Sequence, residues 1–303
     1  MIIDQISREL LIPRPAAEAL VRKATYSYKT YTIPKRGGGQ RTIHHPAKAL
    51  KSIQRWLVDR FISTWPVHEA ARAYRPGVGV LANVRPHREN PYLVRFDLEN
   101  FFPSFSSADV QNYLATQPPG TTAWDDADIQ TFVSLVCRDE QLTIGAPSSP
   151  GLSNAICFDL DSKLEALAIA VGVTYTRYAD DMFFSGVDKD VLRSLPPEVE
   201  CILHELPCPM MLQLNAAKTK FSSRASTRRI TGIVISPDAT LGIGRVQKRI
   251  VKAKIHQWGK LTPEERASLA GMLAYIRNVE PGFIDKMVLK YGAKLVNAAV
   301  RGV

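Results

Sequence analysis

The sequence has few cysteines, no long apolar run and almost no acid along one stretch of its second half. Its 4 cysteines form neither a Cys-x-x-Cys pair nor a His/Cys cluster with zinc-ligand spacing. They therefore predict reduced, mostly buried thiols in an intracellular protein. The longest apolar run, Ala166 to Val173, is far below the roughly 20 residues that span a bilayer. Asp4 and Glu9 do not fit a secretion signal. We therefore expect a soluble, cytoplasmic protein with no membrane partner.

No internal repeat, low-complexity segment or clear flexible linker is visible either. The 303 residues, 45% hydrophobic and 22% charged, are ordinary for a folded soluble protein. A chain of that length is typical of about two domains, or of one globular body with lobes. Without a linker, we expect the lobes to pack together.

Positive charge is in excess and unevenly distributed. The net charge is +10 and the pI about 9.5. Between residues 216 and 260, Asp238 is the only acid. The cations of this stretch are Lys218, Lys220, Arg224, Arg228, Arg229, Arg245, Lys248, Arg249, Lys252, Lys254 and Lys260. A charge run is usually a solvated face, but one this one-sided, with His256 and Trp258 alongside, favours a track for nucleic-acid phosphates.

The stretch from Thr176 to Ser185 places two adjacent acids, Asp180 and Asp181, between two short β-prone, largely apolar runs. This pattern predicts a tight β-hairpin with both carboxylates at its turn. Adjacent acids repel, so such a turn commonly binds cations. A pair of divalent ions held by carboxylates is the usual apparatus for displacement at phosphorus. The alternative is a solvated turn, because aspartate is common in turns.

A third acid follows a second β-prone run. Tyr92 to Asp97 predicts a buried strand that ends in a carboxylate, and Ser106 or Ser107 is suited to cap the helix that starts near Ala108. An aspartate at a strand end is well placed to join an active site. It is equally well suited to a cap or a turn.

Two glycine-rich segments predict loops that approach a ligand. Residues 31–43 predict a hairpin whose Lys35, Arg36 and Arg41 are suited to a triphosphate, although the spacing is not that of a P-loop. The alternative is a flexible basic turn. Gly145 to Asn154 is a small-residue loop that allows close approach of a backbone or base pair, or serves only as a helix entry.

The remaining pattern predicts mainly helices. Residues 1–28 are expected to form two helices separated near Pro13 and Pro15, and the C-terminal part a small helical bundle with Leu269, Met272, Leu273 and Ile276 inward. Further expected elements are helices at 46–65, 129–137, 152–170 and 191–206, and a β section at 230–235.

Taken together and in this order, these blocks resemble the reverse transcriptases of bacterial retrons over nearly the full length. The blocks are the basic hairpin, Asp97 to Ser104, the loop from Gly145, the Tyr-Ala-Asp-Asp hairpin and Asn215 to Lys218. Two further elements distinguish retron enzymes from group II intron and diversity-generating relatives. Residues 83–87 match their Asn-Ala-x-x-His element with Val84 where Ala is usual, and residues 230–232 match their Val-Thr-Gly element. One departure is Ile144, where such polymerases usually carry a Gln that helps to seat the template.

The resemblance implies an α+β right-hand polymerase fold with fingers, a palm with an antiparallel sheet, and a helical thumb. The implied segments are fingers at 1–90 and 115–145, palm at 91–114 and 146–235, and a thumb or RNA-binding region at 236–303.

It also implies RNA-directed DNA polymerase activity with two Mg²⁺ ions. Asp97 and Asp180 are the expected direct ligands of the metal ions. Asp181 is expected to contribute its negative charge or an outer-sphere contact, and Leu98 is included in the expected metal site. The expected nucleotide-binding residues are Lys35, Arg41, Phe102, Ala146 and Lys218. Phe102 takes the position of the steric gate against a ribose 2′-hydroxyl, with a core aromatic as the alternative. Lys218 is expected to assist the leaving group.

The implied partners are dNTPs, a cognate structured non-coding RNA, the DNA that branches from its 2′-hydroxyl, and a separate effector protein in antiphage defence. The residues expected to contact RNA are Asn83, His87, Arg228, Arg229, Thr231, Arg245, Lys248, Arg249, Lys252 and Lys254. For Asn83, His87 and Thr231, a structural role is equally plausible. Rival assignments are another reverse transcriptase group, an RNA-dependent RNA polymerase, or a non-catalytic RNA-binding scaffold that restrains an effector.

Overall fold

The computed structural model describes residues 1–35 and 38–302, which form two compact units assembled from separate stretches of the chain. The first unit contains Met1–Val78, Arg95–Phe184 and Asp190–Lys220. The second contains Gly79–Val94, Ser185–Lys189 and the chain from Phe221 onward. The chain passes between the units several times, so neither unit is one continuous segment.

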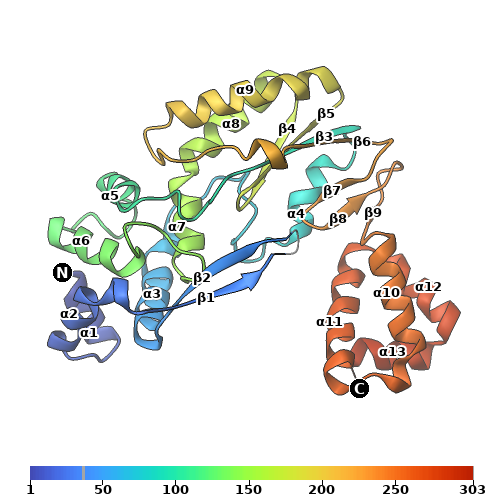
Figure 1. Ribbon diagram of the computed structural model, residues 1–303, viewed down its shortest axis with the longest axis horizontal. Coiled ribbons are helices and arrows are strands. Elements are labelled where there is room, and N and C mark those ends of the chain that lie inside the picture. Colours follow the sequence, from blue (N-terminus) through green and yellow to red (C-terminus); the bar gives the residue numbers. More distant parts are fainter. Residues whose placement is uncertain (36–37, 303) are drawn as a thin grey trace. The chain divides into compact units, whose positions relative to one another are not determined.

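The first unit begins with two short helices, a long hairpin and a third helix (Figure 1). Pro15 lies in the first turn of the second helix, as its fixed φ allows. The predicted glycine hairpin is confirmed, and its antiparallel strands extend beyond the predicted range, from Tyr28 opposite Pro46 to Pro34 opposite Gln40. These elements are α1 (Ile2–Glu9), α2 (Arg14–Arg22), η1 (Ala24–Tyr26), β1 (Tyr28–Pro34), β2 (Gln40–Pro46), α3 (Lys48–Arg60) and η2 (Ile62–Thr64).

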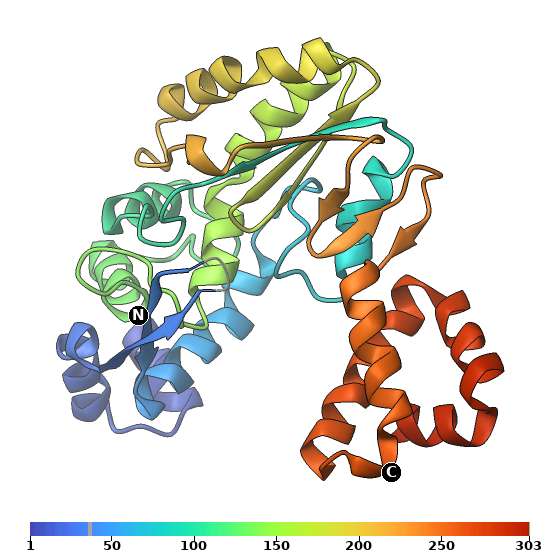
Figure 2. The same ribbon diagram turned by 45° about the vertical axis from the view of Figure 1, so that its right-hand side comes forward.

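A four-stranded sheet with the order β4-β5-β3-β6 carries the predicted acids. Helices α8 and α9 lie on the same side of it in Figures 1 and 2, and α8 packs on β4. The Phe184 ring packs 5.7 Å from that of Phe96 and 4.7 Å from that of Tyr175, so β5 is held by aromatic contacts to both neighbouring strands. The strands are β3 (Tyr92–Asp97), β4 (Thr174–Tyr178), β5 (Asp181–Gly186) and β6 (Lys220–Ser223).

The predicted helices are present with shifted ends, and one of them is divided. Ser106, one of the two residues expected to cap this helix, caps α5 in a capping box with Asp109. The single helix expected at 152–170 is two helices that meet at Cys157, whose N–H is shared between the carbonyls of Ser153 and Ala155. The elements are α5 (Ser107–Ala115), α6 (Asp126–Val136), α7 (Ser149–Ile156), α8 (Phe158–Ala170), α9 (Lys189–Glu205) and η4 (Ala216–Lys218).

The second unit contains a small antiparallel sheet and the predicted helical bundle. Leu269, Leu273 and Ile276 of α11 are buried in the bundle, whereas Met272 is half-buried. Its elements are α4 (Val80–Val84), η3 (Arg85–His87), β7 (Arg228–Ile230), β8 (Ile233–Ile235), β9 (Leu241–Gly242), α10 (Arg245–His256), η5 (Trp258–Lys260), α11 (Pro263–Val279), α12 (Pro281–Tyr291) and α13 (Ala293–Arg301). Among the residues described, no helix is both long and apolar enough to cross a membrane.

Candidate active site

The two adjacent acids lie at the turn between β4 and β5, as the sequence predicts. Strand β4 ends at Tyr178 and β5 begins at Asp181, so Ala179 and Asp180 form the whole connection. Ala179 has a left-handed backbone conformation, with φ +58°. This conformation is sterically unfavourable for a residue other than glycine. The surrounding structure, rather than the backbone preference of Ala179, therefore holds the turn.

Asp97 joins the same end of the sheet because β3 lies beside β5. The N–H of Leu98 donates to the carbonyl of Asp180 at 2.8 Å, which fixes the end of β3 to the acidic turn. On the other side, the N–H of Asn215 donates to the carbonyl of Asp97 at 2.8 Å. Asp97 itself is buried, with 6% of its surface exposed. The structure therefore brings Asp97 together with two acids that lie more than eighty residues further along the sequence.

The acids influence one another electrostatically. Burial raises the pKa of Asp181 to about 6, and the charges of Asp180 and Asp97 raise it too, while Arg95 opposes the shift. Burial likewise raises the pKa of Asp180, and the charge of Asp97 adds to this effect. Like-charged carboxylates that destabilise one another's ionised form are stabilised by a cation between them.

The donor set fits hard divalent cations. Carboxylate oxygens are the ligands that Mg²⁺ prefers, usually with substrate phosphates and water completing its coordination. A cation already lies against one of the acids, since the Lys218 ammonium is 2.7 Å from Asp97 Oδ1. Within residues 1–35 and 38–302, no cluster of three His, Cys, Asp or Glu side chains forms a complete metal site. The acids are thus suited to a site that the substrate would complete.

A cavity of 430 Å³ opens beside the acidic turn, within the first unit. Lys35, Arg41, Phe102 and Lys218 line it, together with Asp180 and Leu98. The prediction that placed Arg36 here falls outside the described residues. Cations from a hairpin on one side and an acidic turn on the other are what a nucleoside triphosphate and its metal ions require.

The small-residue loop contributes to the cavity differently from the prediction. Ala146 is buried, with 4% of its surface exposed, and it is not among the residues that line the cavity. Ile144 does line it, and its carbonyl accepts from the N–H of His44 at 2.8 Å. Gly145 has φ +115°, and a Cβ there would lie 2.8 Å from the carbonyl oxygen of His44. Only glycine allows this close approach of loop and hairpin.

Two aromatic rings form one wall of the cavity. Phe101 and Phe102 both line the cavity, but Phe101 is buried whereas Phe102 is half-buried. The ring of Tyr74 lies 6.3 Å from that of Phe102, and Tyr74 is in a left-handed conformation with φ +61°. The Asn154 amide fixes the preceding carbonyl, of Ala73, at 2.8 Å. Strain at a bulky residue in a binding cavity is a sign of function.

Two residues of this cavity, Arg138 and Tyr74, carry no signal in the sequence. Arg138 is followed directly by two acids in the sequence, so it does not stand out as part of a basic cluster. In the structure it lines the cavity, and its guanidinium is hydrogen-bonded to His44 Nδ1 at 3.1 Å. Tyr74 lies in an irregular segment without any motif of its own. Both reach the cavity through folding rather than through spacing, so sequence reasoning missed them.

The residues predicted to contact RNA lie in the second unit and divide by burial. Asn83 and His87 are buried, and His87 Nδ1 is hydrogen-bonded to Ser185 Oγ at 2.7 Å. This burial favours their structural alternative. Thr231, half-buried with φ +45°, forms the turn between β7 and β8 with Gly232.

Arg228 corrects the predicted RNA surface. It is fully buried, and its guanidinium donates to the carbonyls of Arg88, Asn90 and Ser236. A guanidinium whose donors are used inside the protein is not available to phosphates, so Arg228 joins β7 to its surroundings instead. Lys248 is partly neutralised as well, by Glu280 at 2.5 Å.

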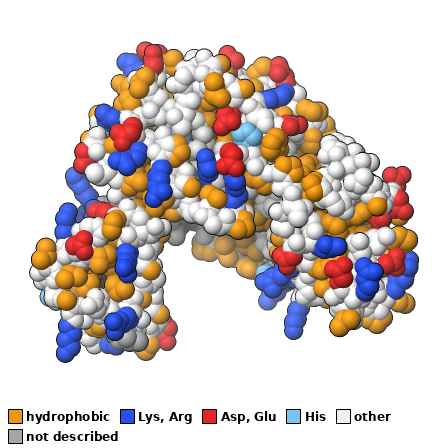
Figure 3. All heavy atoms as spheres, turned by 180° about the vertical axis from the view of Figure 1, so that it is seen from behind, with side chains coloured by type: hydrophobic (Ala, Val, Ile, Leu, Met, Phe, Trp, Pro, Cys, Tyr) orange, Lys and Arg blue, Asp and Glu red, His pale blue; other side chains and the backbone are white. Residues whose placement is uncertain are grey.

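The other predicted cations are accessible. Arg229, Arg245 and Arg249 are exposed, and Lys252 and Lys254 are half-exposed. Arg224, Arg229 and Arg245 line a groove of 840 Å³ beside the start of α10. Figure 3 shows the face opposite to that of Figure 1, where basic and hydrophobic side chains both reach the surface of the helical bundle.

An antiparallel hairpin that presents two acids, a third acid from the neighbouring strand and a cavity lined with cations define a right-hand nucleic-acid polymerase. A family model described as reverse transcriptase (RNA-dependent DNA polymerase) matches residues 33–235. The retron Ec83 reverse transcriptase of Escherichia coli is 31% identical over 284 residues, covering 91% of this chain and 90% of that protein. The retron Ec86 enzyme of the same species is 28% identical over 306 residues, covering 98% and 92%.

The chain belongs to the reverse transcriptase family, and its relatives place it among the reverse transcriptases of retrons. It is therefore an RNA-directed DNA polymerase, a class that depends on divalent metal ions. The fold is also that of a telomerase from Candida tropicalis solved with a fragment of telomeric RNA, with a TM-score of 0.51 and 12% identity. That match covers 96% of this chain, which spans only 58% of the telomerase chain.

Proposed function

We propose that this enzyme copies part of a cognate structured RNA into DNA that branches from a 2′-hydroxyl of the same RNA. The observation that supports catalysis is the convergence of Asp97, Asp180 and Asp181 beside a cavity lined by Lys35, Arg41 and Lys218. A scaffold without activity has no use for mutually repelling carboxylates that are partly or fully withdrawn from water, because they only cost stability.

In this proposal Asp97 and Asp180 hold two Mg²⁺ ions, with Leu98 beside them and Asp181 in an outer or field role. When bound, such ions lower the pKa of the attacking hydroxyl and stabilise the charge that develops on pyrophosphate. The chain supplies the rest. Arg95, 3.7 Å from Asp181, and Lys218 balance the negative charge of the site.

The nucleotide is held by the cavity residues. Lys35 and Arg41 bind the triphosphate, and Lys218, whose ammonium lies at Asp97, assists the leaving group. Phe102 excludes a ribose 2′-hydroxyl and so selects dNTPs, while Ala146 supports the loop behind the cavity. Both Phe101 and Phe102 line the cavity, but Phe102 is half-buried whereas Phe101 is buried, and this greater exposure of Phe102 supports the gate better than the core alternative.

The RNA is bound by exposed cations of the second unit, on β7 and α10. Arg229, Arg245, Arg249, Lys252 and Lys254 form this basic surface, and a structured RNA is recognised largely by its shape and phosphates. We divide the chain into fingers at 1–90 and 115–145, palm at 91–114 and 146–235, and thumb at 236–303. A separate effector protein and a role in antiphage defence complete the proposal, supported by kinship with retron enzymes.

The test is to purify the protein after co-expression with its neighbouring genomic region and to treat the bound nucleic acid with RNase, DNase and debranching enzyme. Short DNA that loses its RNA only on debranching is the expected result. RNA without DNA would favour the scaffold, and absence of nucleic acid would overturn the assignment of the basic surface. An Asp180→Asn variant, which should retain RNA but yield no DNA, is the matched control.

A further inference from the structure

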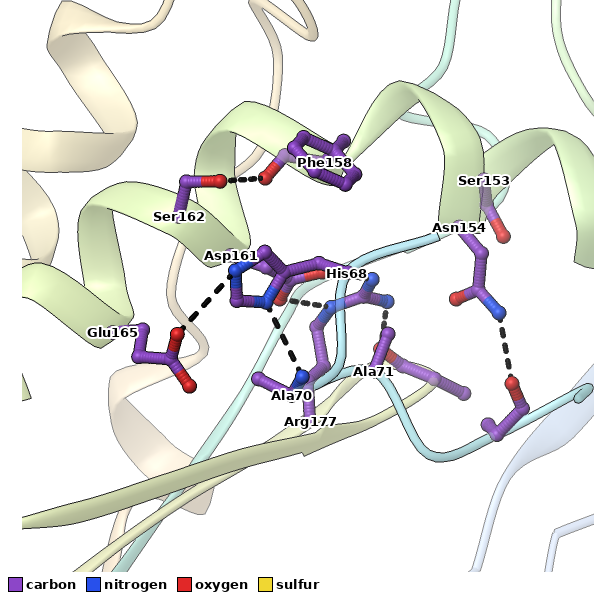
Figure 4. Close-up of polar contacts among 12 residues, drawn as sticks. His68, Ala70, Ala71, Ser153, Asn154, Phe158, Asp161, Ser162, Glu165 and Arg177 are labelled. Atoms are coloured by element: carbon purple, nitrogen blue, oxygen red, sulfur yellow. Dashed lines mark hydrogen bonds and ion pairs between the residues drawn. The ribbon is translucent and has the colours of Figure 1, made fainter. Parts of the chain in front are cut away.

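A fully buried ion pair lies directly behind the acidic turn. Arg177 donates from Nε and Nη2 to the two carboxylate oxygens of Asp161, at 2.8 and 2.6 Å. Neither side chain is exposed to solvent. The Tyr175 hydroxyl donates to the same carboxylate at 2.8 Å. Figure 4 shows Asp161 on α8 meeting Arg177 from β4.

The remaining arm of the guanidinium reaches the turn itself. Arg177 Nη1 donates to the carbonyl of Ala179 at 3.1 Å, which is the peptide that joins Ala179 to Asp180. The backbone of Arg177 is fixed as well, because its N–H donates to Ala70 and its carbonyl accepts from Arg72, both at 2.8 Å. Helix α8 is thus connected through two side chains to the peptide immediately before a candidate metal ligand.

Stability alone does not account for this arrangement. A buried ion pair loses so much solvation that apolar residues of the same volume are often as stabilising. The planar fork of arginine, however, fixes direction, and a third donor remains for the turn. The left-handed Ala179 is the position at which such an external constraint is needed.

We propose that the Asp161–Arg177 pair is a positioning device that holds the Ala179–Asp180 peptide, so that the Asp180 carboxylate faces the divalent cation site. Arg177 and Asp161 are positioning residues, since neither touches substrate. The inference rests on the proposed role of Asp180 as a metal ligand, and the experiments separate the two.

Arg177→Lys keeps the charge opposite Asp161 but lacks the fork that reaches Ala179. We expect kcat per active site to fall about 10- to 100-fold, with KM for dNTP nearly unchanged, as for a small misplacement of a reacting group. In the substrate-free protein, the Mn²⁺ concentration that gives half-maximal binding by electron paramagnetic resonance should rise several-fold. Active-site titration corrects for any inactive fraction.

The matched control is Glu165→Gln. Glu165 lies one turn further along α8 and pairs with His68 at 3.5 Å in the same polar cluster, without reaching the turn (Figure 4). It should leave both readouts unchanged. If Arg177→Lys does not fold, the double variant Asp161→Asn/Arg177→Gln leaves no unpaired buried charge and should show the same weakened Mn²⁺ binding.

Wild-type kcat and Mn²⁺ binding in either folded variant would overturn the inference and leave the pair a purely structural contact. Asp180→Asn is measured alongside. If it binds Mn²⁺ and polymerises like the wild type, the proposed function fails. If it is inactive while Arg177→Lys is normal, only the positioning role fails.

Discussion

The acidic turn and the basic surface of α10 are both concentrations of one charge, but they are built in opposite ways. Asp97 is buried, Asp180 and Asp181 are half-buried, and the turn is fixed by a backbone hydrogen bond from Leu98 and by the Arg177 guanidinium. The cations Arg229, Arg245 and Arg249 are exposed on a short strand and a helix. Buried charges act through exact position, whereas exposed charges act additively and are screened by salt. Single substitutions should therefore abolish polymerisation in the first region, whereas in the second each should weaken RNA binding by a small step.

The largest effect is expected at the acids. Asp97→Asn or Asp180→Asn should reduce polymerisation by at least about 1,000-fold, equivalent to roughly 4 kcal/mol of transition-state stabilisation. The neutral amide keeps the shape but lacks the charge that a divalent cation needs. Primer extension on an RNA template measures the loss, and RNA binding should stay within about twofold because the exposed cations are untouched. Retained polymerisation would remove these acids from the mechanism.

Phe102→Ala should next relax sugar selection. We expect discrimination against ribonucleotides to fall about 100-fold. Without the ring nothing clashes with the 2′-hydroxyl, and only a modest difference in contact between the two sugars remains. The measurement compares kcat/KM for dNTP and rNTP. Phe105→Leu, a change to a buried ring that does not line the cavity, is the control and should leave the ratio of the two kcat/KM values unaltered. An unchanged ratio in Phe102→Ala would return this residue to the core alternative.

Neutralising the basic surface should have a graded effect. Arg245→Gln with Arg249→Gln should weaken RNA binding about tenfold at moderate salt and lower the slope of log K against log salt by roughly one to two. Lys23→Gln with Lys189→Gln removes the same charge from exposed positions elsewhere. Equal losses in the two double variants would mean that RNA responds to net charge rather than to this surface.

The smallest effect is on stability. Because the pKa of Asp181 is raised to about 6, the unfolded chain loses this proton first, and stability should fall as pH rises from about 4 to about 6. Asp181→Asn should remove this penalty. Without divalent ions at pH 7.5 it should be more stable than the wild type by about 1 to 2 kcal/mol, allowing for screening of a partly exposed side chain.

Denaturation at pH 4 and 7.5, with EDTA or with Mg²⁺, measures this difference. It should vanish at pH 4 and shrink with Mg²⁺, which stabilises the wild-type acids. Asp285→Asn, a change at an exposed acid on α12, should show neither dependence. A variant less stable than the wild type at pH 7.5 would mean that Asp181 makes a favourable contact that outweighs its burial.

The sequence by itself determined the local features: the hairpin with Asp180 and Asp181 at its turn, the strand that ends at Asp97, the Ser106 cap and the helical C-terminal part. Each follows from spacing within a few residues, where turn chemistry and apolar periodicity act. The order of the blocks was also sufficient for the family.

Only the tertiary structure decided which of these residues meet. The order β5-β3 brings Asp97 to the turn, and burial removes Arg228 from the predicted RNA surface although its neighbour Arg229 stays exposed. Tyr74 and the Asp161–Arg177 pair have no local signature, because their partners lie far away in the chain. The physical reason is that desolvation and long-range contacts depend on what packs around a side chain, and no short stretch of sequence contains that information.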